Sequence, residues 1–331
     1  MTHSESIELV KRPEYDFLRT NPHLGKSIIL LGLSGSHAYG TNLDTSDVDM
    51  RGVALNSPSE ILLNNDFASI VDTNTDTTIY SFNKIIFELT KCNPNLIEML
   101  GLDPHDYIFI NQYGQLLLDN KKLFLSKLCI KKFCGYATEQ LYRLQQKSLY
   151  AMTDEELNAH ITKVMNSMCD RLNDQYDTDI TACLNESKIV LNGTFNNVPI
   201  ENTTGILSEL NNTYRDYTKH SHRNENALTH GKIAKHSEHL IRVLMEGIDI
   251  LEKHVIITKR IKEHDLLMDI RTGKYLDSNG QPNSAFYDIV HEYNNKFEYA
   301  SKHTTLPELP DYDAINELKM HVNKSIIITS F

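Results

Sequence analysis

Residues 33–53, LSGSHAYGTNLDTSDVDMRGV, place a Gly-Ser pair directly after one apolar run and an Asp-x-Asp pair at the start of another. The preceding run, KSIILLGL (26–33), suits a buried strand because it is continuous, apolar and rich in isoleucine and leucine. The run VDMRGVAL (48–55) predicts a second strand. The stretch therefore predicts a strand, a turn at Gly35 and Ser36, and a strand that contains the second aspartate.

The segments that follow predict the rest of a small mixed β-sheet with flanking helices. Ser57 or Ser59 is a suitable N-cap for a short helix in SPSEILL. FASIVD (67–72) and TTIYSF (77–82) are separated by TNTD and favour a hairpin. NKIIFELTKC is helical in pattern and ends at Asn93-Pro94, after which NLIEML begins a new turn in which Glu98 is interpreted as a helix-start acid.

From about residue 120 onward the pattern becomes mainly helical, with spaced apolar residues and charged faces. Helices are predicted in 131–152, 154–174 and 227–254, an exposed loop or hairpin in 192–205, and a last helix after LPELPDYD (306–313). We therefore expect an α+β fold in which an N-terminal domain, residues 1–115, is followed by a helical lobe, residues 116–331, that closes over a cleft.

The composition is that of an ordinary globular protein with an acidic balance. Its 33 basic and 44 acidic residues give a net charge of −11, which disfavours a broad positive surface for a polyanion but permits a narrow basic cleft. The five cysteines form no CxxC pair and predict reduced thiols. We expect a cytoplasmic protein, because no apolar run approaches the ~18 residues of a membrane span and the N-terminus lacks a signal-peptide core.

The residue types in the opening stretch are those that phosphate and magnesium require. Aspartates at i and i+2 of a strand point to the same face, so Asp47 and Asp49 can share metal ions. Magnesium usually binds one or two carboxylates together with phosphate oxygens. Gly35 lets the backbone approach a phosphate, and Ser36 adds a hydroxyl and an N–H. Each pair alone is common in loops, but the two in this order predict nucleotidyl transfer, in which a hydroxyl attacks the α-phosphate of a nucleoside triphosphate.

The same stretch resembles the signature of the DNA polymerase β-like nucleotidyltransferase superfamily. The longer match, GSHAYGT followed by SDVD and RGV, resembles one branch, the RlaP family of predicted RNA-repair nucleotidyltransferases of bacteria and large phages. NPNLIEML (93–100) and KHSEHLIRVL (235–244) also resemble segments of that family. The resemblance implies a nucleoside triphosphate such as ATP as substrate and two Mg²⁺ ions, for which Mn²⁺ can substitute.

The superfamily resemblance also implies a third acidic residue on a neighbouring strand. The candidates are Asp72 and Asp76, at the two ends of the DTNTD turn. Asp76 is preferred because it leads directly into TTIYSF and the following helix. The alternative for both residues is a local turn role, which aspartate favours.

Five further residues are candidates for binding the nucleotide. Lys235, His239 and Arg242 form one stripe of the predicted helix 227–254, either as a solvated face or as cations that reach a phosphate. Arg51 follows the second aspartate by two residues and suits a phosphate contact or a surface ion pair. Tyr39 suits either base stacking or the core.

The acceptor is open at this stage. An RNA end, such as that of a tRNA, is the first expectation from the resemblance, and a protein side chain or a small molecule is the alternative that the acidic net charge favours. A catalytically silent nucleotide-binding module is the rival from another class, and the presence of both Asp47 and Asp49 argues against it.

Overall fold

The computed structural model describes residues 2–148 and 232–329. The chain divides into two compact units, of which the first comprises Met1–Tyr142, Ala234–Leu276 and Pro282–Phe331, and the second Arg143–Ile233 and Asp277–Gln281. The helix expected in 154–174 and the loop expected in 192–205 lie outside the described residues. The domain boundary near residue 115 stays a prediction.

A mixed five-stranded sheet forms the centre of the N-terminal part, as expected for an α+β fold. The strand order is β3-β4-β2-β1-β5, with β2 and β4 parallel and the other neighbouring pairs antiparallel. The strands are β1 (Ile28–Ser34), β2 (Asp49–Ala54), β3 (Ser69–Asp72), β4 (Thr77–Ser81) and β5 (Tyr107–Ile110). Every residue of β1 is buried, which explains its continuous apolar sequence.

The predicted hairpin and the serine-capped helix in SPSEILL are confirmed. β3 and β4 pair in antiparallel register from Ser69 opposite Tyr80 to Asp72 opposite Thr77. Ser57, rather than Ser59, caps α4 (Pro58–Leu63): its hydroxyl accepts from the Glu60 N–H, and the Glu60 carboxylate accepts in return from the Ser57 N–H. The remaining helices of this part are α1 (His3–Leu9), α2 (Phe17–Thr20), α3 (Gly35–Tyr39), α5 (Phe82–Leu89), α6 (Pro94–Ile97) and α7 (Gln112–Asp119).

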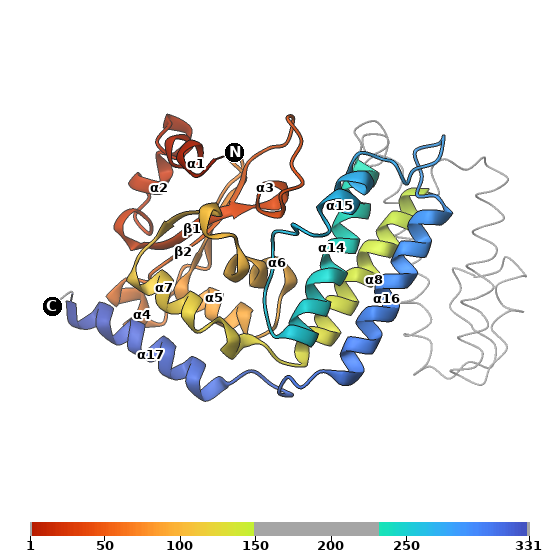
Figure 1. Ribbon diagram of the computed structural model, residues 1–331. Helices are drawn as coiled ribbons and strands as arrows, with labels where there is room; N and C mark the ends of the chain where they lie inside the picture. The colour runs from red at the N-terminus through yellow and green to blue at the C-terminus, as the bar shows by residue number, and fades with distance from the viewer. Residues whose placement is uncertain (1, 149–231, 330–331) are drawn as a thin grey trace, which may run out of the picture. The chain divides into compact units, whose positions relative to one another are not determined.

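The described residues from Leu128 onward are mainly helical. The helices are α8 (Leu128–Ser148), α14 (Lys232–Lys253), α15 (His264–Arg271), α16 (Ser284–His303) and α17 (Tyr312–Thr329). Gly247 of α14 lies where a larger side chain would meet Phe133 of α8 and Phe297 of α16, so these three helices meet closely (Figure 1). α17 returns to the N-terminal part and contacts α4 and α5 (Figure 1).

Two sequence expectations about thiols and membranes can be compared with the described residues. Cys92 and Cys129 are buried and Cys134 is exposed, all as free thiols, whereas Cys169 and Cys183 lie outside the described ranges. Within residues 2–148 and 232–329, no helix has the length and apolar character needed to cross a membrane.

Candidate active site

A pocket of about 270 Å³ opens where β2 begins, beside the β3–β4 turn. Its volume is slightly below the ~300–1,000 Å³ of typical small-molecule sites, which suits a phosphate chain better than a whole nucleotide. Of the three aspartates predicted to bind metal, Asp49 and Asp76 line this pocket and Asp47 does not. Asp72, the alternative third acid, also lines it. The lining residues are Ser34, Gly35, Asp49, Met50, Arg51, Val71, Asp72, Thr73, Asp76 and Thr78.

Gly35 and Asp49 touch across the first pair of strands. Ser34, the last residue of β1, lies opposite Asp49, the first residue of β2, so the turn residue after β1 meets the Asp49 side chain. Gly35 has a φ of 59°, which non-glycine residues rarely adopt. A Cβ atom at this position would lie 2.9 Å from Asp49 Cγ and would clash with Asp49 Oδ2. Ser36 is 7% exposed and does not line the pocket.

The pocket carries an excess of negative charge around Asp49. Burial raises the pKa of the Asp49 carboxyl above its ordinary value. The positive charge of Lys235, and more weakly that of Arg51, lowers this pKa. The negative charge of Asp76, and more weakly that of Asp47, raises it. Asp47 itself is exposed, just before β2, and does not line the pocket. Lys235 is exposed near the start of α14. The two predicted metal aspartates therefore differ in environment, with Asp49 half-buried and Asp47 open to solvent.

The two candidates for the third acid use their carboxylates differently. Asp72 Oδ1 accepts hydrogen bonds from the N–H groups of Asn74 and Thr75 and from the Thr75 hydroxyl, at 3.2, 2.9 and 2.9 Å. The Asp76 carboxylate makes no hydrogen bond or ion pair with the residues that the structure describes. The backbone of Asp76 is held beside β2 because its carbonyl accepts from the Met50 N–H at 3.2 Å. Asp76 thus presents a free carboxylate to the pocket, and Asp72 stabilises the turn.

Arg51 connects the pocket with a buried cluster of charged and aromatic side chains. Its Nη1 donates to Glu98 Oε1 at 2.9 Å and to the Asn95 carbonyl. Glu98 is 4% exposed; its Oε1 also accepts from the Tyr39 hydroxyl at 2.9 Å, and its Oε2 accepts from Arg242 at 3.1 Å. Burial alone would lower the pKa of Arg51, but the Glu98 carboxylate raises it, so Arg51 remains charged.

Three predicted nucleotide-binding residues lie in or beside this cluster rather than along the pocket lining. Arg242 is 1% exposed, and its guanidinium carbon lies 3.3 Å from the centre of the Tyr39 ring, a cation–π contact. Arg242 Nη2 donates to His239 Nδ1 at 2.7 Å, so the neutral His239 ring carries its proton on Nε2 and donates it to the Tyr136 hydroxyl at 2.9 Å. Burial and the neighbouring Arg242 hold the pKa of His239 well below its ordinary value, in agreement with a neutral ring.

The predicted stripe on α14 thus runs from solvent into the interior. Lys235 is exposed, His239 is partly buried and Arg242 is fully buried, so a solvated face describes only the first of them. Sequence reasoning missed the residue that gathers this cluster, since Glu98 was expected to act only as a helix-start acid. One signal was present: Glu98 stands between Ile97 and Met99 in an otherwise apolar run, where an acid requires a buried partner.

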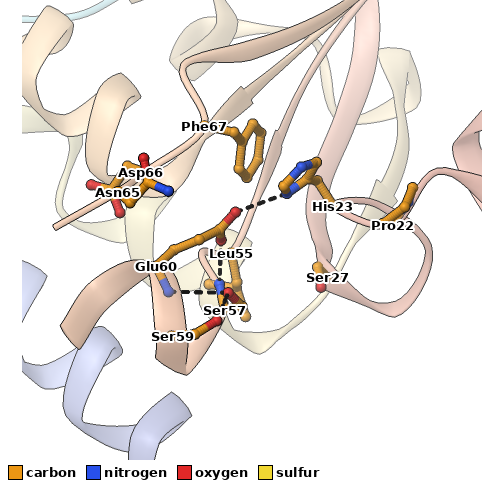
Figure 2. A pocket seen from close by; sticks show the side chains of 10 residues that line it. All are labelled: Pro22, His23, Ser27, Leu55, Ser57, Ser59, Glu60, Asn65, Asp66 and Phe67. Atoms are coloured by element: carbon orange, nitrogen blue, oxygen red, sulfur yellow. Dashed lines mark hydrogen bonds and ion pairs between the residues drawn. The ribbon is translucent and has the colours of Figure 1, made fainter. Parts of the chain in front are cut away.

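A larger pocket of about 510 Å³ lies at the other end of β2, next to Leu55 (Figure 2). In it, His23 Nδ1 pairs with Glu60 Oε1 at 2.8 Å, and the His23 ring is tilted against Phe67 with 4.7 Å between the ring centres (Figure 2). None of the residues predicted for catalysis or nucleotide binding lines this pocket. Although it is larger, this pocket is therefore not the candidate active site.

Residues 11–165 match the protein family RlaP, described as the RNA repair pathway DNA polymerase beta family. The match covers slightly less than half of the chain, which is therefore similar to this family over that region. The matched region contains all five strands, the aspartate pocket and Glu98, whereas the α14 residues Lys235, His239 and Arg242 lie outside the RlaP match. No curated protein matches the chain. The RlaP match points to a polymerase β-like nucleotidyltransferase.

The pocket fits a divalent cation of the hard, oxygen-binding kind. Among the described residues, no group of three or more His, Cys, Asp or Glu side chains is placed to hold a metal ion. Magnesium does not need such a group, because it usually binds one or two carboxylates and completes its shell with water and phosphate oxygens. The half-buried Asp49 and the unpaired Asp76 carboxylate supply such oxygens, and their mutual repulsion would be relieved by a cation.

Proposed function

We propose that this protein transfers a nucleoside monophosphate from a nucleoside triphosphate to a hydroxyl group of an acceptor, in a magnesium-dependent reaction. The observation that carries the proposal is the contact between Gly35 and Asp49, which places a carboxylate against the turn backbone at the mouth of a pocket. The RlaP match over residues 11–165 supports the same reaction class.

Six residues in or near the pocket have a task in the proposed reaction. Asp47, Asp49 and Asp76 would hold magnesium, which when bound neutralises phosphate charge and favours ionisation of the attacking hydroxyl. Gly35 leaves room for the phosphates to approach the backbone beside Asp49. Arg51 carries a guanidinium at the pocket edge that suits phosphate oxygens. Lys235 adds a positive charge near Asp49 from α14.

The proposed acceptor is an RNA end. The description of the RlaP family as an RNA-repair family supports this choice. The net charge of −11 restricts RNA to a local cleft. A protein side chain or a small molecule as acceptor is a distinct outcome of the experiment below.

The test combines the aspartate pair with a matched control in the same loop. The protein is incubated with Mg²⁺, each α-labelled ribonucleoside triphosphate and a cell lysate, and label is followed into RNA, protein and small molecules. Asp47→Asn with Asp49→Asn should abolish labelling, whereas Asp44→Asn, an exposed acid of the same loop, should not. Undiminished labelling by the double variant would refute the site. Triphosphate binding without any labelling would favour a silent nucleotide-binding module.

A further inference from the structure

We propose that Glu98 is a positioning residue that holds the Arg51 guanidinium at the edge of the Asp49 pocket for contact with nucleotide phosphates. This inference rests on the proposed function, since it assigns the phosphate-binding role to Arg51. It departs from the sequence interpretation, in which Glu98 serves only the start of a helical turn.

The first step is the direction in which Arg51 points. Asp49 and Arg51 are at i and i+2 of β2 and share one face of the sheet, and both line the pocket. A free arginine side chain samples many rotamers, and fixing it in one of them costs side-chain entropy. Here the side chain is already ordered before a ligand binds, because Nη1 of Arg51 is fixed by Glu98 and by the Asn95 carbonyl.

The second step concerns the N–H groups of Arg51 that are left free to bind a ligand. Both hydrogen bonds use Nη1, and the Nε and Nη2 groups of Arg51 have no hydrogen-bond partner among residues 2–148 and 232–329. The Arg51 side chain is 27% exposed, whereas Glu98 is 5% exposed, so the acid lies behind the guanidinium. The free N–H groups of a partly exposed guanidinium that is already fixed in place are suited to phosphate oxygens, which accept paired donors.

The third step is the charge behind Arg51. Glu98 is shared between Arg51 and Arg242, so one carboxylate faces two guanidinium groups. Glu246 lies 3.8 Å from Arg242 but does not contact Arg51, and its raised pKa leaves it mostly protonated at neutral pH. Because Glu98 is divided between two guanidinium groups, it compensates the positive charge of Arg51 only in part, which favours an anionic ligand at the pocket.

Glu246 provides a matched control that separates a positioning role of Glu98 from a purely structural one. Both are buried glutamates next to Arg242, but only Glu98 touches Arg51. Glu98→Gln should weaken binding of Mg²⁺ with α,β-methylene ribonucleoside triphosphates by about tenfold or more, the loss expected for a hydrogen bond between charged groups. Glu246→Gln should change that affinity by less than about twofold.

The decisive comparison is made in an Arg51→Ala background. If Glu98 acts through Arg51, adding Glu98→Gln to Arg51→Ala causes no further loss of affinity. A full additional loss in that background, or wild-type affinity of a folded Glu98→Gln protein, would overturn the proposal. Circular dichroism and thermal unfolding report folding. Glu98→Asp, which keeps the charge but withdraws the carboxylate, gives the same comparison should Glu98→Gln not fold.

The binding readout separates this proposal from the proposed reaction. A wild-type protein that binds the triphosphate analogues but transfers no label would remove the reaction and leave the Glu98 comparison valid. A wild-type protein that binds none of them would overturn both.

Discussion

The carboxylate of Asp49 occupies the space into which a side chain at position 35 would extend. Gly35 therefore serves two purposes, since its φ of 59° turns the chain after β1 and its missing Cβ admits Asp49. One residue of the Gly-Ser pair and one of the Asp-x-Asp pair, 14 positions apart in the sequence, are therefore in contact in the fold.

Gly35→Ala should abolish nucleotidyl transfer and lower stability. The new methyl group would displace the Asp49 carboxylate, and the left-handed backbone alone costs alanine about 1–2 kcal/mol. Transfer of α-labelled nucleotide and urea unfolding check both effects. Gly135→Ala in α8 is the control, because a Cβ there meets nothing within 4 Å; it should keep activity and gain up to ~1 kcal/mol of stability.

Asp76→Asn should reduce transfer by at least about 100-fold, whereas Asp72→Asn should keep most of it. The reason is that Asn can accept the same hydrogen bonds as Asp72 within the turn, while the free carboxylate of Asp76 has no neutral substitute. Asparagine also tolerates the φ of 45° at position 76, so both variants should fold. Single-turnover labelling of the two proteins is the measurement. The opposite ranking would assign the third carboxylate to Asp72.

Glu246 should make the protein less stable as the pH rises. Burial, followed by the Glu98 charge, raises the pKa of Glu246 from 4.5 to about 8, against the opposing effects of Arg242 and Arg260 and with Asp249 adding to the rise. The folded protein keeps a proton on Glu246 that the unfolded chain releases. The stabilisation that comes from this bound proton is therefore complete below about pH 4.5 and is lost as the pH rises through about 8.

Urea unfolding from pH 5 to 9 of the wild type and of Glu246→Gln measures this dependence. The free energy of unfolding of the wild type relative to the variant should fall with pH, by at most ~1.4 kcal/mol per pH unit. Parallel pH curves for the two proteins would mean that Glu246 ionises in the folded state as easily as in the unfolded one.

Arg242→Met should destabilise the protein by about 3–5 kcal/mol, because it removes a buried partner of Glu98 and the cation above the Tyr39 ring. Lys302→Met, which breaks an exposed pair with Glu298 on α16, should change stability little. Thermal unfolding compares the two substitutions, and an equally small effect at Arg242 would contradict a tightly paired buried cluster.

Short-range patterns in the sequence were sufficient for β1, β2, the β3–β4 hairpin and the cap at Ser57. Each of these depends on neighbouring residues: an apolar run, an i and i+2 alternation, or a hydroxyl before a helix. Several elements were not predicted, including β5, α7, α15 and α16. β5 has only four residues at the edge of the sheet, and α16 buries only Phe286, Val290, Phe297 and Ala300 along a mostly polar helix.

The sequence by itself determined that β1 ends before Gly35, that Asp47 and Asp49 lie around the start of a strand, and that the class is α+β, since backbone geometry and local periodicity govern all three. The turn predicted at Gly35 and Ser36 is instead the beginning of the short helix α3. Only the tertiary structure decided the surroundings of Glu98. Its partners Tyr39 and Arg242 are 59 and 144 residues away along the chain, and no local pattern encodes which distant cations share a buried acid. Low-polarity surroundings then require that such an acid be paired, and this requirement brings α14 and β2 to the same carboxylate.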